Sequence, residues 1–223
     1  MSPDLYIRCR EDLEKAVEEW GIVPFFRHSV PGFSIAERVD PALWFTDQPG
    51  PWEWKGPVIR NTGCAYGKFF QHKAAYISRE WFYHFANWRR DGYDFDARWD
   101  EGLATRKEKY LYELLAAHAP ILSKDLKELG GYGKEGLKGF DPTLARLQEQ
   151  GYVTVSDFVY LTDKRGKPYG WGVAEYTTPE QLFGPDFGEK AYSCEPEESY
   201  EKILAHLLRL TGGDEAAVKR FLK

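Results

Sequence analysis

The sequence predicts an α+β fold that is mainly helical and contains a winged helix-turn-helix and short antiparallel β-hairpins. Two observations predict this class. Helical periodicity of apolar residues recurs along most of the chain, and between Lys107 and Thr178 three helical segments are followed by two β-rich runs. Helix, helix, helix and hairpin is the element order of a winged helix, and this order indicates nucleic-acid binding.

Length and composition set the outer limits of the interpretation. The chain has 223 residues, of which 43% are hydrophobic, so it can bury a sizeable core. We expect an aromatic-rich α+β region at 1–104, the winged helix-turn-helix at 105–180, and helices at 181–223 that pack on the body. No apolar run is long enough for a membrane span, and the charged start MSPDLYIRCRED does not resemble a signal peptide. We therefore expect a cytoplasmic protein without a membrane partner.

The sequence shows no metal or cofactor motif, so we expect none of either. The histidines are scattered, and the loop GYGKEGLKG lacks the Gly-Lys-Ser/Thr step of a phosphate-binding loop. The three cysteines are widely spaced and odd in number, which favours free thiols.

The first region begins with a helix and continues into a dense aromatic tract. EDLEKAVEEW repeats apolar residues at helical spacing and ends at Gly21, and a short helix is predicted around Ser34 to Arg38. Six of the eight tryptophans fall between Trp44 and Trp99. Within this tract GPWEWKGPVIR and CAYGKFFQHKAAYIS are typical of short strands, and SREWFYHFANWRRDG is typical of a helix capped by Ser78. The aromatic residues form either a thick core or a stacking surface.

The second region holds the three helices of the proposed winged helix. Arg106 to His118 forms an amphipathic helix, and Ser123 is expected to cap the next one. Asp141 and Pro142 are expected to supply the N-cap and first residue of the third helix, DPTLARLQEQG. Leu144 and Leu147 point inward by spacing. The opposite flank then carries the predicted groove contacts, with a solvated helix face as the alternative: Thr143, Arg146 and Gln150.

A β-hairpin with a basic tip follows. YVTVSDFVYLTD and KPYGWGVAEYTT enclose Lys164, Arg165, Gly166 and Lys167. The three cations are predicted to contact phosphates, with simple turn solubility as the alternative. The net charge is −5, and Arg106 to Glu175 holds eleven Lys/Arg against ten Asp/Glu. Any basic face must therefore arise from the spatial arrangement of these charges.

Two segments resemble a known family. FQHKAAYISREWFYHFANWRR, and LSKDLKELGGYGKEGLKGFDPTLARLQEQGYVTVSDF, are similar to segments of the YcaQ/AlkZ family of DNA glycosylases, and nearest to its shorter AlkZ-related proteins. The resemblance implies winged-helix domains, double-stranded DNA as the partner, and a relation to enzymes that remove alkylated or cross-linked bases. The family's glutamine-centred catalytic motif would fall on Val23 to Phe26, where this chain has no glutamine or acid. The resemblance therefore does not imply that this chain has the family's catalytic activity.

Four other residues are candidates for a relocated active site. His72 stands where the family has a histidine, and Gln71 precedes it. Asp94 and Asp96 would face the same way in an extended segment, and close like charges raise the pKa of one carboxyl toward acid–base use. A structural ion-pair network with the neighbouring arginines, or a ligand site, is the alternative.

Three functions remain open. The favoured one is a DNA-binding winged-helix protein that recognises damaged DNA without the catalytic glutamine motif. The runner-up is an active glycosylase that hydrolyses the N-glycosidic bond of modified bases with the relocated residues. The third is a non-enzymatic regulatory or protein-interaction module, for which an acidic pI would be natural.

Overall fold

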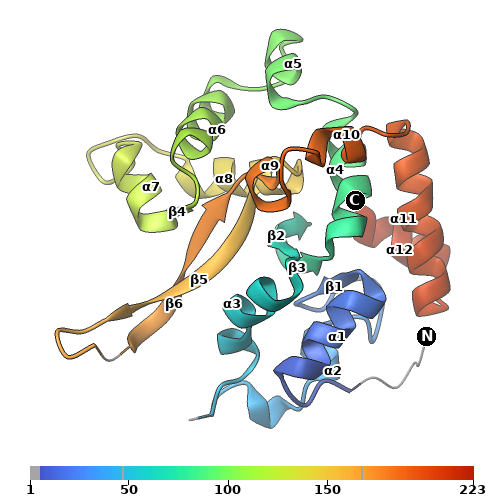
Figure 1. The fold of residues 1–223 in the computed structure, drawn as a ribbon. Coiled ribbons are helices and arrows are strands. Elements are labelled where there is room, and N and C mark those ends of the chain that lie inside the picture. The colour runs from blue at the N-terminus through green and yellow to red at the C-terminus, as the bar shows by residue number, and fades with distance from the viewer. Residues whose placement is uncertain (1–5, 47, 167) are drawn as a thin grey trace.

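Residues 6–46, 48–166 and 168–223 are described by the structure, a computed structural model (Figure 1). The described residues form one six-stranded sheet surrounded by helices. The helices are α1 (Arg10–Trp20), α2 (Ile35–Arg38), η1 (Pro41–Leu43), α3 (Pro51–Thr62), α4 (Arg79–Arg90), α5 (Phe95–Asp100), α6 (Arg106–His118), α7 (Ser123–Leu129), α8 (Phe140–Glu149), α9 (Pro179–Phe183), α10 (Phe187–Ala191), α11 (Pro196–Thr211) and α12 (Glu215–Leu222). The strands are β1 (Ile22–Pro24), β2 (Ala65–Phe70), β3 (Lys73–Ile77), β4 (Ile121–Leu122), β5 (Thr154–Thr162) and β6 (Pro168–Thr177).

The six strands form one antiparallel sheet in the order β1-β3-β2-β5-β6-β4. This confirms the predicted mixture of helices with antiparallel hairpins, since β2–β3 and β5–β6 are both hairpins. The strands β1 to β3 join the strands β4 to β6 at one position in the sheet, where Tyr66 of β2 pairs with Val155 of β5. The side chain of Thr154 strengthens this junction, because its hydroxyl accepts from Tyr66 N and donates to Tyr66 O.

Two hydrophobic cores lie on either side of this junction. The larger combines α1, the first three strands, α3 and α4 with the C-terminal helices, and Trp20, Phe85 and Leu207 are among its members. The smaller core packs α6, α7 and α8 around Leu111 and Tyr152. The predicted boundaries at 104/105 and 180/181 stay predictions.

Buried Arg90 ties α4 to two later segments. Its side chain is 1% exposed, and its Nη2 donates to the carbonyl oxygen of Gly151 at 2.7 Å. Its Nη1 donates to Glu180 at 2.7 Å and to the Tyr192 hydroxyl at 2.9 Å. Gly151 has a φ of 77°, and a Cβ there would lie 3.2 Å from the backbone of Ala86. Glycine therefore allows the chain leaving α8 to approach α4 closely.

Most of the predicted helices are confirmed, including α1, α4 and α6, but the prediction of strands at GPWEWKGPVIR is wrong. Residues 51–62 form α3, with Pro51 in its first turn, where the missing N–H has no helical partner to lose. Glu53 accepts from Gly50 N and caps the helix start. Trp54 and Val58 are buried four residues apart, which is helical spacing.

The starts of α7 and α8 also differ from the predictions. Leu122, and not Ser123, is the N-cap of α7. Helix α8 starts at Phe140 with Gly139 as its N-cap, so Asp141 and Pro142 lie inside its first turn. Gly139 adopts a φ of 95°, which a glycine accepts without strain and which lets the loop turn directly into the helix.

Residues 106–177 run in the order α6, β4, α7, α8, β5 and β6, and β4 pairs with β6. The β5–β6 hairpin extends away from the helices as a long arm (Figure 1). Within the described residues, no helix combines the length and the apolar character needed to cross a membrane.

Candidate nucleic-acid interface

Helix α8 has one fully packed side, and this side includes Thr143. The prediction that Thr143 shares an exposed flank with Arg146 is wrong, because Thr143 is only 9% exposed. Thr143 lies three residues after Phe140 and four before Leu147, so helical spacing places it in the apolar stripe with these residues and Leu144. Thr143 therefore offers little surface to a DNA groove.

Arg146 lies on the open side of α8 and contacts α6. Its side chain is 57% exposed, and its Nε lies 2.8 Å from Oε1 of Glu108, which is 2% exposed. The other carboxylate oxygen of Glu108 accepts from Thr105 N at 2.7 Å in the capping box of α6. Arg146 thus neutralises a buried acid, while its outer guanidinium nitrogens remain available to a ligand.

The remaining predicted DNA contacts lie at two other places. Gln150 is half-buried at the C-terminal end of α8, and its Oε1 has no hydrogen-bond partner among the described residues. Lys164 and Arg165 are exposed at the tip of the β5–β6 hairpin, where Arg165 N donates to Asp163 Oδ1. Lys167, the third predicted tip cation, lies outside the described residues.

The two-residue turn between β2 and β3 carries Gln71 and His72. Both have positive φ, 51° and 59°, as a two-residue hairpin turn requires, although neither is glycine. His72 N donates to Glu149 Oε1 of α8 at 2.7 Å, and its Nδ1 lies 3.1 Å from the same oxygen. Gln71 Nε2 donates to the carbonyl of Arg220 in α12. These contacts hold an unfavourable backbone conformation in place.

Asp94 and Asp96 lie at the start of a helix. The expected extended segment is therefore wrong, and the two carboxylates do not share a face as they would in a strand. Asp94 is the N-cap of α5 and accepts from Ala97 N at 2.7 Å, while Asp96 is exposed in the first helical turn. The segment forms a helix because Asp94 satisfies a free N–H of its first turn. Among the described residues, neither carboxylate forms an ion pair with an arginine.

The structure does not bring the four candidate catalytic residues together. Gln71 and His72 contact α12 and α8, whereas Asp94 and Asp96 belong to α5, which stands apart from the β2–β3 hairpin (Figure 1). A shared active site for these residues is not formed in this arrangement. Their catalytic role stays a prediction.

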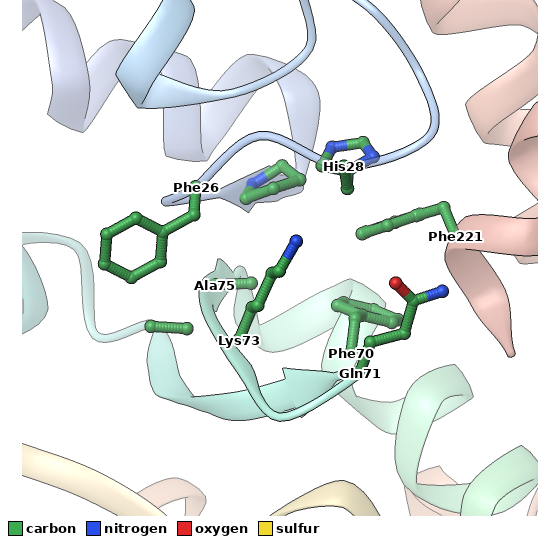
Figure 2. A pocket seen from close by; sticks show the side chains of 9 residues that line it. Phe26, His28, Phe70, Gln71, Lys73, Ala75 and Phe221 are labelled. Atoms are coloured by element: carbon green, nitrogen blue, oxygen red, sulfur yellow. The ribbon is translucent and has the colours of Figure 1, made fainter.

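A narrow pocket lies beside the β2–β3 turn (Figure 2). Pro24 and Phe26 line one side of it, and Phe70 and Phe221, whose ring centroids are 4.4 Å apart, line another. Lys73 Nζ points into the pocket in Figure 2 and donates to the carbonyl of Arg27 at 2.8 Å. The cavity volume is about 10 Å³, which is room for one water molecule and not for a nucleobase.

A protein-family model described as AlkZ related matches residues 7–223. The chain belongs to the AlkZ-related family. The resemblance inferred from residues 70–90 and from the α7–α8 segment is thereby confirmed. No curated protein and no solved structure matches the chain.

In this AlkZ-related protein, the positions expected for a catalytic glutamine motif are taken up by strand β1 and the residues after it. Val23 and Pro24 pair with Tyr76 and Ala75 of β3. Phe25 is completely buried. These positions therefore place no glutamine or acid beside the pocket, whose polar side chains come from His28, Gln71 and Lys73.

Two residues that position α8 were missed by the sequence reasoning. Glu108 is the buried partner of Arg146, and the pattern Thr105-x-x-Glu108 marks it as the last member of a capping box. Gln148 is buried, and its Oε1 accepts from Lys68 N of β2 at 3.1 Å. No local signal identifies Gln148, because its partner is eighty residues away.

Proposed function

We propose that this AlkZ-related protein binds double-stranded DNA through residues 105–180, which we interpret as a winged helix. In this proposal α8 is the recognition helix and the β5–β6 hairpin is the wing. The observation that carries it is the order α6, β4, α7, α8, β5, β6 with β4 paired to β6. In this order three helices accompany the three strands at one end of the sheet, and Arg146 of α8 and the tip of the β5–β6 hairpin are exposed.

Exposed cations at three places on this region support the proposal. Lys164 and Arg165 are exposed on the hairpin tip, Lys134 is exposed in the loop before α8, and Arg146 lies on the open side of α8. Lysine and arginine side chains of this kind contact DNA phosphates, and such contacts do not depend on the base sequence. Because the whole chain has a net charge of −5, we expect binding to be confined to this region and to be sensitive to salt.

Membership of the AlkZ-related family also supports a DNA partner, and two observations favour binding over base excision. The pocket at the position of the family's catalytic motif holds about 10 Å³. The candidate residues lie at two separate places, Gln71 and His72 in the β2–β3 turn and Asp94 and Asp96 at the start of α5. We therefore propose recognition of DNA, including damaged DNA, without cleavage of the N-glycosidic bond.

The test is the salt dependence of binding to a fluorescently labelled 20-base-pair duplex, measured by anisotropy. The variant is Lys164→Ala/Arg165→Ala, because these exposed side chains can be removed without disturbing a core. Each lost phosphate contact reduces the slope of log K against log salt by about 0.9, so the double variant is expected to lose about two units of slope.

Lys15→Ala/Lys219→Ala is the matched control. These two lysines are exposed on α1 and α12, where each pairs with a neighbouring glutamate. Their replacement removes two positive charges, as the hairpin variant does. The control is expected to keep the wild-type slope. Absence of any complex at low salt would contradict the proposal and favour the protein-interaction alternative, and equal slopes for the two variants would exclude the hairpin as the wing.

A further inference from the structure

A cleft of about 200 Å³ lies on one face of the sheet, between α3 and α8. Tyr66 of β2, Phe158 of β5 and Tyr176 of β6 form much of its floor. Lys55 of α3 stands on one side and Gln148 of α8 on the other. The cleft therefore spans the junction at which β2 meets β5, and none of its contacts involves the predicted catalytic residues.

Lys55 is a half-buried cation that forms no ion pair with an acid among the described residues. Its Nζ lies 4.0 Å from the ring centroid of Phe158 and 5.1 Å from that of Trp52. Burial lowers the pKa of Lys55 to about 8, and nearby Glu53 opposes this only in part. The carboxylate of Glu53 accepts from Gly50 N, and no ion pair joins it to Lys55 among the described residues. A partly desolvated ammonium in this setting favours an anion beside it.

The other polar groups of the cleft are also suited to an anion. No aspartate or glutamate is among the described lining residues, and a second lysine, Lys68, lies on the rim. The hydroxyls of Tyr66 and Tyr176 make no hydrogen bond to another described residue. Two cations and two free hydroxyl donors around an aromatic floor match a phosphate ester.

Trp52 connects Lys55 of the cleft to an exposed tryptophan on the hairpin. Trp171 of β6 is 67% exposed, and its ring meets that of Trp52 edge-on at 6.3 Å. The ammonium group of Lys55 lies over the Trp52 ring. An indole that leaves most of its surface in solvent beside a cationic cleft provides a face on which a base can stack.

We propose that the cleft and Trp171 together bind one unpaired nucleotide, its phosphate held by Lys55 and Lys68 and its base stacked on the Trp171 ring. A volume of about 200 Å³ is below the usual range for a complete small-molecule site, so the base remains outside, on the indole. The nucleotide comes either from a distorted duplex or from a free nucleoside monophosphate. The first source rests on the proposed function, and the second does not.

The experiment compares three ligands of the full chain. They are a fully paired duplex, the same duplex with one bulged nucleotide, and deoxyadenosine monophosphate, with anisotropy for the duplexes and calorimetry for the mononucleotide. Base–aromatic stacking predicts about tenfold tighter binding of the bulged duplex than of the paired one. Lys55→Met and Trp171→Ala are each expected to abolish this preference, and Lys55→Met, which lies outside the proposed winged helix, is expected to leave paired-duplex affinity unchanged. Lys219→Met, which likewise removes one lysine charge but from the exposed face of α12, is expected to keep the preference.

The outcomes separate this inference from the proposed function. Equal binding of both duplexes with no binding of the mononucleotide overturns the inference and leaves the proposed function intact. A preference for the bulge that persists in both cleft variants also overturns it. Binding of the mononucleotide that is lost in Lys55→Met, with no duplex bound, supports the cleft as a free-nucleotide site and overturns duplex binding. If wild type binds none of the three ligands, both proposals fail.

Discussion

Replacing Arg146 with alanine should destabilise the fold as well as weaken DNA binding. Glu108 is 2% exposed and lies 2.8 Å from Arg146 Nε, so the variant leaves a buried carboxylate without its cation. Breaking a fully buried ion pair costs about 3–5 kcal/mol. Because the arginine side chain is 57% exposed, water replaces part of the lost interaction, and we expect a loss of about 1–2 kcal/mol in the free energy of unfolding.

Urea denaturation of a double-mutant cycle measures this contribution. The cycle combines Arg146→Ala with Glu108→Gln, and a coupling energy of about 1 kcal/mol is expected because the two side chains are in contact. Arg106→Ala, at an exposed position on the same helix as Glu108, should change stability by less than about 0.5 kcal/mol. A coupling energy of zero, or equal effects of the two arginine variants, would refute the role assigned to Arg146.

Three further predictions concern other parts of the molecule. Arg90→Met should lower the free energy of unfolding by about 3 kcal/mol in chemical denaturation, because Gly151 and Glu180 lose a buried donor; a loss below about 1 kcal/mol would contradict this. His72→Gly should raise the free energy of unfolding by about 1 kcal/mol, since a φ of 59° is costly for histidine, and an unchanged or lower melting temperature would show that the turn is unstrained. Lys55, with a pKa of about 8 when folded, binds fewer protons above that pH than it does in the unfolded chain, whose ordinary lysine pKa is 10.5. Stability should therefore rise from pH 8 toward pH 10 in wild type and rise less in Lys55→Met, and identical pH profiles would exclude this assignment.

The helices that the sequence predicted correctly are those with a regular apolar stripe along one face. Helices α1 and α6 repeat apolar residues every three or four positions, and Gly21 and Thr105 mark one end of each. The strands of the β2–β3 hairpin were also predicted, although the turn lacks the usual glycine. Their signal is the run of small and aromatic residues that a sheet accommodates.

The errors arose where local signals were ambiguous. Around α3, alternating tryptophans and two Gly-Pro steps are typical of short strands, and only the burial of Trp54 with Val58 selects the helix. At α8, Thr143 precedes Leu147 by four residues, so helical spacing places it beside the buried leucines. The error lay in grouping Thr143 with Arg146, although it lies closer to the packed stripe.

The cleft was beyond sequence reasoning for a different reason. Its lining comes from α3, α8 and four strands that are separated by long stretches of chain. Lys55 has one partner nearby in sequence, Trp52, but its closer ring contact is Phe158 on β5. A cation without an acidic partner becomes visible only when the tertiary contacts are known.

The junction between β2 and β5 has a consequence for how the protein unfolds. One threonine hydroxyl, that of Thr154, takes the place of a peptide group and bonds both the N–H and the carbonyl of Tyr66. Valine, which is isosteric with threonine, would leave the N–H and carbonyl of Tyr66 without this partner. We expect Thr154→Val to loosen the junction locally, while the contacts of Arg90 with Gly151 and of Gln148 with Lys68 keep the two parts of the chain together.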